Sequence, residues 1–168
     1  MTSSIVYETA LVQFRPIVSS EERVNVGVLV FSPDLSQLQW RITDHYRRLK
    51  DLYPRLDGKQ YRSMRRAFEI RIQRTAGRPA DPKQRVMIGA KSLSEIMSVL
   101  LPSDGSAFVY SAVRFGHCND LEARTAELYE EYVEQYERLS VRERIDNEVL
   151  WERVKTSPQF QEVAPHVK

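Results

Sequence analysis

The unbroken apolar run Val28-Leu29-Val30-Phe31 constrains the fold more than any other part of this chain. A strand without polar alternation is typically buried on both faces, so the segment 24–31 predicts an internal strand with packed layers on either side. Strand entries rarely combine a carboxylate, a guanidinium and an amide, so we expect the polar entrance to meet a specific group. The residues that lead into the run are Glu22, Arg23, Asn25 and Gly27.

Other segments supply partners for that strand. Residues 5–15 are rich in β-branched and aromatic residues and end at Pro16, and residues 38–43 alternate between apolar and polar side chains. Because the connections between these segments are short, we expect antiparallel hairpins. The predicted sheet has strands near 5–15, 24–31, 38–43 and 107–115.

Capping residues and apolar positions at helical spacing predict five helices. Thr43 or Asp44 is expected to cap the first helix and Asp57 the second, while Ser92 and Glu95 have the spacing of a capping box. Asn119 or Asp120 is expected to cap the longest helix. The predicted helices lie near 44–53, 57–74, 92–101, 120–139 and 141–155. Strands followed by helices, then a strand and more helices, predict an α+β fold with helices packed on an antiparallel sheet.

The chain has the length and composition of one ordinary globular domain, with 168 residues, of which 42% are apolar and 29% charged. We expect a single domain over residues 1–157 and a loosely ordered tail over 158–168. A single cysteine, Cys118, cannot form an internal disulfide, and the chain does not start with a basic region followed by an apolar core. These features favour a cytoplasmic protein, and the apolar runs fall far short of the roughly 20 residues of a membrane helix.

Charge is segregated along the chain although the net charge is only +2. Residues 41–85 contain fourteen Lys or Arg and five Asp or Glu, a net +9, whereas residues 119–152 contain four and eleven, a net −7. Such asymmetry is typical of nucleic-acid or phosphate binding, of two halves that attract each other, or of two solvated helix faces. We favour solvated helix faces.

The chain contains several short motifs, which are Tyr7, Phe14-Arg15-Pro16, Glu22 to Val28, Arg48-Leu49-Lys50 before Leu52-Tyr53-Pro54, and Leu128 to Val133. Through these motifs the chain resembles a bacterial family known only as domain of unknown function three-zero-three-seven, over about residues 5–139. The resemblance implies a small cytoplasmic bacterial protein without an accepted activity, and it carries no catalytic residues. Some relatives lie beside genes for HipA-like kinases, which implies an accessory role.

The first candidate site is the polar cluster at the entrance to the internal strand, formed by Arg15, Glu22, Arg23 and Asn25. Arginine and glutamate at one strand end are suited to binding a phosphate or a peptide terminus. The structural interpretation is that the charged groups pair with each other and that Asn25 satisfies loop backbone. We favour the structural interpretation for the pairing, but the cluster is still the best candidate for contact with a protein partner.

The second candidate site is an arginine-rich helix and loop. Spacings of three and four residues place several of its arginines on one exposed helix face, where each can neutralise one phosphate of a nucleic acid. The aromatic residues Tyr61 and Phe68 are expected to face inward, which weakens the case for single-stranded nucleic acid. The residues are Arg62, Arg65, Arg66, Arg71, Arg74, Arg78, Lys83 and Arg85.

The third candidate is the adjacent pair His117 and Cys118, which suggests thiol or metal chemistry. Adjacent strand residues point apart, and the chain has too few Cys and His residues for a zinc site, so we expect neither a metal nor a cofactor. Cys118 at a helix start is a position where a thiol pKa can be lowered. No base is placed to activate this thiol, so we expect no catalysis at the pair.

The leading hypothesis is therefore a non-enzymatic interaction or accessory module. Its sheet and the polar cluster at 15–25 would bind a protein partner, such as a HipA-like kinase or a defence-type effector. The alternative is a nucleic-acid-binding protein that uses the Arg-rich segment 62–85. A third, weaker hypothesis is an enzyme with an unfamiliar site at the polar cluster.

Overall fold

The structure is a computed structural model that describes residues 4–16, 21–76, 90–101 and 107–137. Residues Met1–Val133 form one compact unit, and the second unit, Glu134–Lys168, is described only over 134–137. The predicted helix at 141–155, the domain end at 157 and the tail at 158–168 lie outside the described residues. The elements are β1 (Ile5–Phe14), β2 (Val24–Ser32), β3 (Gln37–Ile42), α1 (Arg47–Leu52), α2 (Gly58–Ala76), α3 (Leu93–Leu100), β4 (Phe108–Tyr110), β5 (Arg114–Cys118) and α4 (Leu121–Tyr129), followed by a π-helix over Glu130–Glu134.

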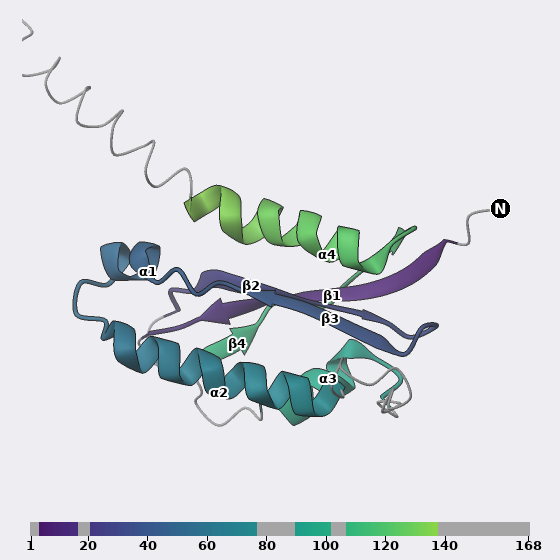
Figure 1. The fold of residues 1–168 in the computed structure, drawn as a ribbon, viewed down its shortest axis with the longest axis horizontal. Coiled ribbons are helices and arrows are strands. Elements are labelled where there is room, and N and C mark those ends of the chain that lie inside the picture. Colours follow the sequence, from purple (N-terminus) through teal and green to yellow (C-terminus); the bar gives the residue numbers. More distant parts are fainter. Residues whose placement is uncertain (1–3, 17–20, 77–89, 102–106, 138–168) are drawn as a thin grey trace, which may run out of the picture. The chain divides into compact units, whose positions relative to one another are not determined.

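The five strands form one antiparallel sheet in the order β3-β2-β1-β4, with β5 also paired to β1. The predicted α+β class is thus confirmed. In β2, every residue except Asn25 is buried, as the apolar run predicts. Helices α2 and α3 cover one face of the sheet, and α4 covers the other (Figure 1). Within the described part of the chain, no helix has the length and apolar content needed to cross a bilayer.

The predicted strand at 107–115 is wrong as a single element. It is two short strands, β4 and β5, which pair with opposite ends of β1 and are separated by Ser111–Val113. Ser111 bridges the gap, because its N–H donates to the carbonyl of Leu11 over 3.0 Å and its hydroxyl accepts from the N–H of Leu11 over 2.9 Å. A side chain therefore replaces one backbone group of the ladder, and the strand can bend there.

A bulge lies between β1 and β2. Val12 pairs with Gly27 and Gln13 pairs with Asn25, so Val26 has no residue opposite it. One extra residue reverses the in-and-out alternation of a strand, and it therefore lets the buried residues on both sides of the bulge reach the correct layer. Val24, Val26, Leu29 and Phe31 face α2 and α3, and Val28 and Val30 face α4.

Gly27 follows the bulge and is required by the close approach of β3. A Cβ at this position would lie 2.6 Å from the backbone oxygen of Arg41 and 2.9 Å from Cγ1 of Ile42. Gly27 therefore permits the close approach of a neighbouring strand.

Local capping signals predict three of the four described helix starts. Asp57 accepts from the N–H of Lys59, Ser92 accepts from that of Glu95, and Asp120 accepts from those of Glu122 and Ala123. The predicted cap at Thr43 or Asp44 is wrong. Helix α1 begins at Arg47 after Tyr46, which makes no side-chain capping bond, and the Thr43 hydroxyl instead accepts from the N–H of His45 over 3.1 Å.

The π-helix changes the buried face of the last helix. Residues Leu121, Thr125 and Leu128 are buried at α-helical spacing, but the next buried residue is Val133, five positions on. A π turn inserts one residue, so it rotates the following side chains around the helix axis. Tyr136, eight residues after Leu128, is 43% exposed.

Candidate functional site

The structure places the polar cluster of Arg15, Glu22, Arg23 and Asn25 at one end of the sheet, where β1 ends and β2 begins. Phe14 pairs with Val24, so Arg15, which follows β1, and Arg23, which precedes β2, lie at the same end of the sheet. Arg15 is partly buried, and its backbone N–H donates to the carbonyl of Ala107 over 2.7 Å. Arg23 is exposed.

Two members of this cluster are held by structural contacts. Asn25 accepts from the side-chain amide of Gln13 over 2.9 Å and donates to the carbonyl of Tyr132 over 3.4 Å, so it links the sheet to the π-helix. Burial and the hydrogen-bonded carboxylate of Glu22 raise the pKa of Tyr53. Glu22 thus contacts Tyr53. Glu22 and Arg23 are the exposed members of the cluster, and Arg15 and Asn25 are partly buried.

The outer edge of β3 runs along one side of the sheet, and its Ile42 end lies near the polar cluster. Among the described residues, β3 pairs only with β2, and Thr43 donates its N–H to the carbonyl of Val26 over 2.8 Å. Hydrogen-bonded pairs alternate along an antiparallel ladder, so the next residues that bond to β2 are Arg41, Gln39 and Gln37. The backbone N–H and C=O groups of Leu38, Trp40 and Ile42 therefore point away from β2, toward the open edge.

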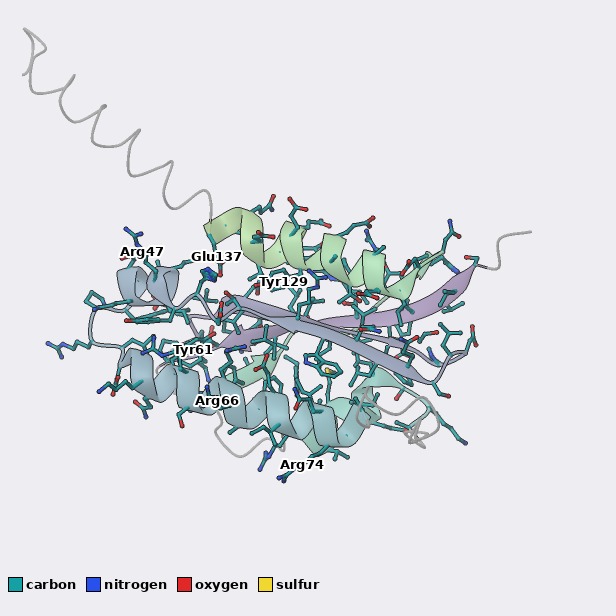
Figure 2. The ribbon with its side chains drawn as sticks, in the orientation of Figure 1. Arg47, Tyr61, Arg66, Arg74, Tyr129 and Glu137 are labelled. Atoms are coloured by element: carbon teal, nitrogen blue, oxygen red, sulfur yellow. The ribbon has the colours of Figure 1, made fainter. Side chains whose placement is uncertain are left out.

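Several of the predicted nucleic-acid contacts on α2 are engaged within the protein. The guanidinium of Arg62 lies 4.9 Å from the ring centroid of Tyr46, and Arg65 makes two 2.9 Å hydrogen bonds to Glu69. Arg71 donates to the carbonyl of Leu100 over 3.2 Å. Arg66 and Arg74 are exposed, and Arg74 projects away from the sheet (Figure 2). Arg78, Lys83 and Arg85 lie outside the described residues.

His117 and Cys118 are neighbours at the end of β5. His117 is exposed and Cys118 is partly buried, so the two side chains face opposite sides of β5. Burial raises the pKa of the Cys118 thiol, although the residue lies near a helix start. Nowhere in the described ranges do three His, Cys, Asp or Glu side chains come close enough to hold a metal ion.

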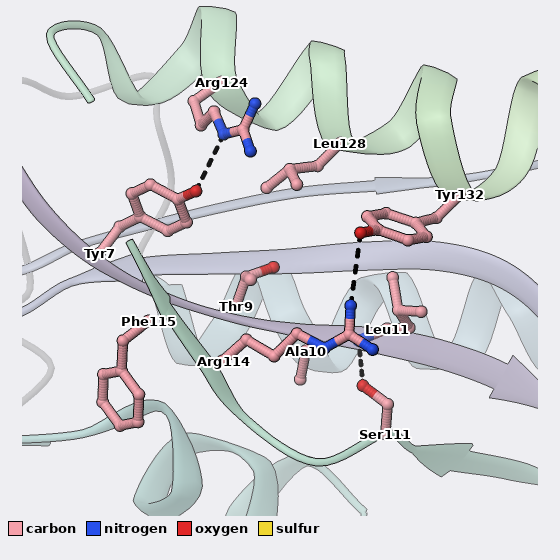
Figure 3. A pocket seen from close by; sticks show the side chains of 10 residues that line it. All are labelled: Tyr7, Thr9, Ala10, Leu11, Ser111, Arg114, Phe115, Arg124, Leu128 and Tyr132. Atoms are coloured by element: carbon pink, nitrogen blue, oxygen red, sulfur yellow. Dashed lines mark hydrogen bonds between the residues drawn. The ribbon is translucent and has the colours of Figure 1, made fainter. Parts of the chain in front are cut away.

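The sequence did not single out a second polar region, which lies on the α4 face of the sheet. A cavity of about 140 Å³ lies beside β1, between α4 and the segment that leads into β5 (Figure 3). Arg124 on α4 donates to the hydroxyl of Tyr7 over 2.9 Å, and Arg114 on β5 donates to that of Tyr132 over 3.3 Å. No local motif links these residues, because Tyr7 and Arg124 are separated by 117 positions. From the sequence, one could recognise only the alternation of residues along the two strands and the helical spacing of Arg124 and Tyr132.

Gly116 allows one of these pairs to form. It lies opposite Tyr7 in the ladder, and a Cβ there would lie 2.5 Å from the Tyr7 hydroxyl oxygen. The tyrosine ring can therefore lie across β5 and reach α4. Arg124 also donates to Glu127 over 2.8 Å, and the hydrogen bonds to Glu127 and Tyr7 raise its pKa, so it is permanently charged.

Comparison with known proteins gives a family without an assigned activity. The model of the family described as "Protein of unknown function (DUF3037)" matches residues 9–133, which include the polar cluster, β3, α2 and the lining of the cavity beside α4 except Tyr7. No curated protein and no solved structure matches the chain.

Proposed function

The chain belongs to the DUF3037 family, and we propose that it is a non-enzymatic interaction module that binds an extended segment of a protein partner along the open edge of β3. The observation that carries the proposal is the set of outward backbone groups at Leu38, Trp40 and Ile42. An extended peptide adds to such an edge as a further strand, and its main-chain hydrogen bonds supply much of the affinity.

Exposed charge near this edge favours an acidic partner segment. Arg41 is exposed on β3, and Arg23 is exposed where β2 begins. Ile42 pairs with Gly27, so the edge ends on the side of the sheet from which Arg23 emerges. Opposite charges near an edge steer association and fix the register of the added strand more than they raise the affinity. The HipA-like kinase implied by the family resemblance is the first partner to test.

A matched pair of variants at Trp40 tests the edge. The N–H of Trp40 points away from β2, so Trp40→Pro removes one outward donor and leaves the β2–β3 ladder intact. Trp40→Ala removes the same indole but keeps the donor. We expect both variants to fold by circular dichroism and only Trp40→Pro to lose the partner. Equal binding of both folded variants would reject augmentation at β3.

A second measurement does not depend on the folding of a proline variant. In hydrogen exchange on the purified complex, we expect partner binding to slow exchange at the amides of Leu38, Trp40 and Ile42, but not at those of Gln39 and Arg41, which already bond to β2. To find the partner, a photo-crosslinking residue at Gln37 in native-host cells is compared with one at Gln60, which is exposed on α2. The double charge reversal Arg23→Glu with Arg41→Glu should weaken crosslinking from position 37. If the three amides are unchanged in the complex, the proposal is wrong.

Nucleic-acid binding is the rival prediction, and a salt titration separates it from the proposal. Phosphate contacts release counterions, so the logarithm of the affinity falls steeply with the logarithm of the salt concentration. If α2 binds nucleic acid, Arg66→Gln with Arg74→Gln should reduce that slope by about two, and the β3 variants should not change it. Absence of DNA or RNA binding at low salt would end the rival.

A further inference from the structure

The cavity beside α4 has a composition that the proposed β3 edge does not explain. Its polar lining consists of two arginines and four hydroxyl groups, and it contains no carboxylate. The two guanidiniums come from different elements, Arg114 from β5 and Arg124 from α4, and each is positioned by a tyrosine (Figure 3). We propose that this cavity binds a phosphate group.

The hydrogen-bond inventory of the cavity shows an excess of donors. A tyrosine hydroxyl that accepts from a guanidinium keeps its own proton for donation. Within the described residues, neither Tyr7 nor Tyr132 donates that proton to an acceptor. Arg114 has further N–H groups beyond the one bonded to Tyr132, because a guanidinium carries five. Donors without acceptors around a polar cavity are suited to a ligand that brings several acceptor oxygens.

In the described residues, neither of the other two hydroxyl groups of the lining accepts a hydrogen bond from these tyrosines and arginines. Thr9 donates to the carbonyl of Leu29 over 2.9 Å, and Ser111 accepts from Leu11 and donates to Ala112. The carboxylate of Glu127 binds the Nη1 of Arg124 but is not part of the cavity wall. The positive charge on Arg114 has no carboxylate partner among the ion pairs of the described residues.

Size and geometry select the kind of anion. The cavity of about 140 Å³ has room for a small anionic group. The donors come from β1, β5, α4 and the π-helix, so they approach the cavity from several directions. A tetrahedral phosphate presents oxygens in that way, whereas a carboxylate is planar and is best bound by one coplanar arginine.

The packing of the sheet explains why the cavity exists. Helix α4 packs mainly on β2 and β3, and the cavity lies beside Thr9 and Leu11 on the neighbouring strand β1. Ser111, at the break between β4 and β5, forms part of its wall. The two Arg–Tyr pairs border the space that remains, and Leu128 adds an apolar wall.

Calorimetric titration with sodium phosphate at constant ionic strength tests the site, with acetate and chloride as controls. Hydrogen bonds to charged groups are strong, so we expect Arg114→Gln to weaken phosphate binding about tenfold to hundredfold. Arg114 is exposed, and its replacement should leave the fold unchanged. Arg66→Gln removes the same charge from the exposed surface of α2 and should change the affinity by less than about twofold. Equal losses in the two variants would mean that only the overall charge attracts phosphate, and would overturn the proposal.

Tyr132→Phe separates a donor role from a packing role. The variant keeps the ring and removes only the hydroxyl, so we expect about a threefold to tenfold loss of phosphate affinity with an unchanged melting temperature in phosphate-free buffer. Unchanged phosphate affinity in this variant would also overturn the proposal. So would the absence of a heat of binding when the wild-type protein is titrated to about 20 mM phosphate, because a dissociation constant above that concentration would be too weak for a specific site.

A comparison of two phosphate sources identifies the carrier of the group. If phenyl phosphate binds more tightly than inorganic phosphate, the ligand is a phosphomonoester. Equal affinities assign the site to the phosphate ion itself.

Discussion

The two faces of the sheet bury their residues in different ways. The face under α2 and α3 is a continuous apolar core in which Phe14 lies 5.1 Å from Tyr61 and 5.5 Å from Phe108 between ring centroids, and Phe68 stacks on Phe108 at 5.4 Å. The face under α4 has a small cluster around Tyr7, Val28, Val30, Leu121 and Leu128, next to a polar cavity. One layer is filled with aromatic rings, and the other combines apolar packing with arginines.

This difference separates stability from ligand binding. Close-packed aromatic residues contribute most to the free energy of folding, and they leave no space for a ligand. Donors beside a cavity contribute little to folding until an acceptor arrives. The comparison therefore predicts that substitutions under α2 and α3 lower stability, whereas polar substitutions under α4 change binding.

The largest expected effect is a truncation in each layer. Phe14→Ala should lower the free energy of unfolding by about 4 kcal/mol, because the residue is 1% exposed and two other aromatic rings, Tyr61 and Phe108, border the space it would leave. Leu128→Ala should cost about 2 kcal/mol, at the low end for leucine, because its side chain already borders a cavity. Urea unfolding measures both values. Equal losses would mean that the two faces contribute alike.

The next effect concerns the strand between the two layers. Gly27→Ala should destabilise the protein by about 3 kcal/mol, since the added Cβ meets a backbone oxygen that cannot move without separating β2 from β3. Hydrogen exchange should show faster exchange at Thr43, whose N–H bonds to Val26 beside this position. A variant as stable as the wild type would show that β3 is loosely held, and would weaken the case for its edge as a docking surface.

Features governed by nearby residues could be predicted from the sequence. The caps at Asp57, Ser92 and Asp120 bind backbone groups two or three residues away. The unbroken apolar run of β2 indicates by itself that the strand is buried. The inward positions on α2 follow from helical spacing alone, and Tyr61, Phe68 and Ile72 are buried as predicted.

Features that depend on distant residues could not be predicted. The break between β4 and β5 rests on Ser111 and Leu11, which are 100 positions apart, and Arg124 meets Tyr7 across 117 positions. The π turn is set by how the last helix meets Asn25 and the sheet, and no spacing rule in the helix itself announces it. The polar cluster was visible at Arg23 and Asn25, but the open groups of β3 follow only from its register with β2.

A smaller effect is expected at the contact between β1 and α3. The buried carboxylate of Glu8 accepts from the N–H of Leu93 over 2.7 Å at the start of α3. Glu8→Gln keeps an acceptor but loses the charge that favours a helix N-terminus, so it should cost about 1 kcal/mol. Glu95→Gln is the matched control, because Glu95 binds the N–H of Lys91 at the exposed surface of the same helix start and should cost only about 0.3 kcal/mol. If thermal unfolding gives equal losses, burial adds nothing to this contact.

The smallest effect compares one chemical deletion on both faces. Tyr61 is fully buried and donates its hydroxyl proton to the carbonyl of Thr43 over 3.2 Å, so Tyr61→Phe should cost about 1 kcal/mol. Among the described residues, the Tyr132 hydroxyl accepts one hydrogen bond, from the exposed Arg114 over 3.3 Å, and Tyr132→Phe should change stability by less than about 0.3 kcal/mol. Adding phosphate should reverse the order of importance, because the ligand stabilises the folded state in proportion to its affinity and only the Tyr132 hydroxyl contributes to that affinity. In 20 mM phosphate, well above a dissociation constant of about 1 mM, the wild type and Tyr61→Phe should therefore gain thermal stability by the same increment, and Tyr132→Phe should gain less. Equal increments in all three proteins would place phosphate outside the cavity beside α4.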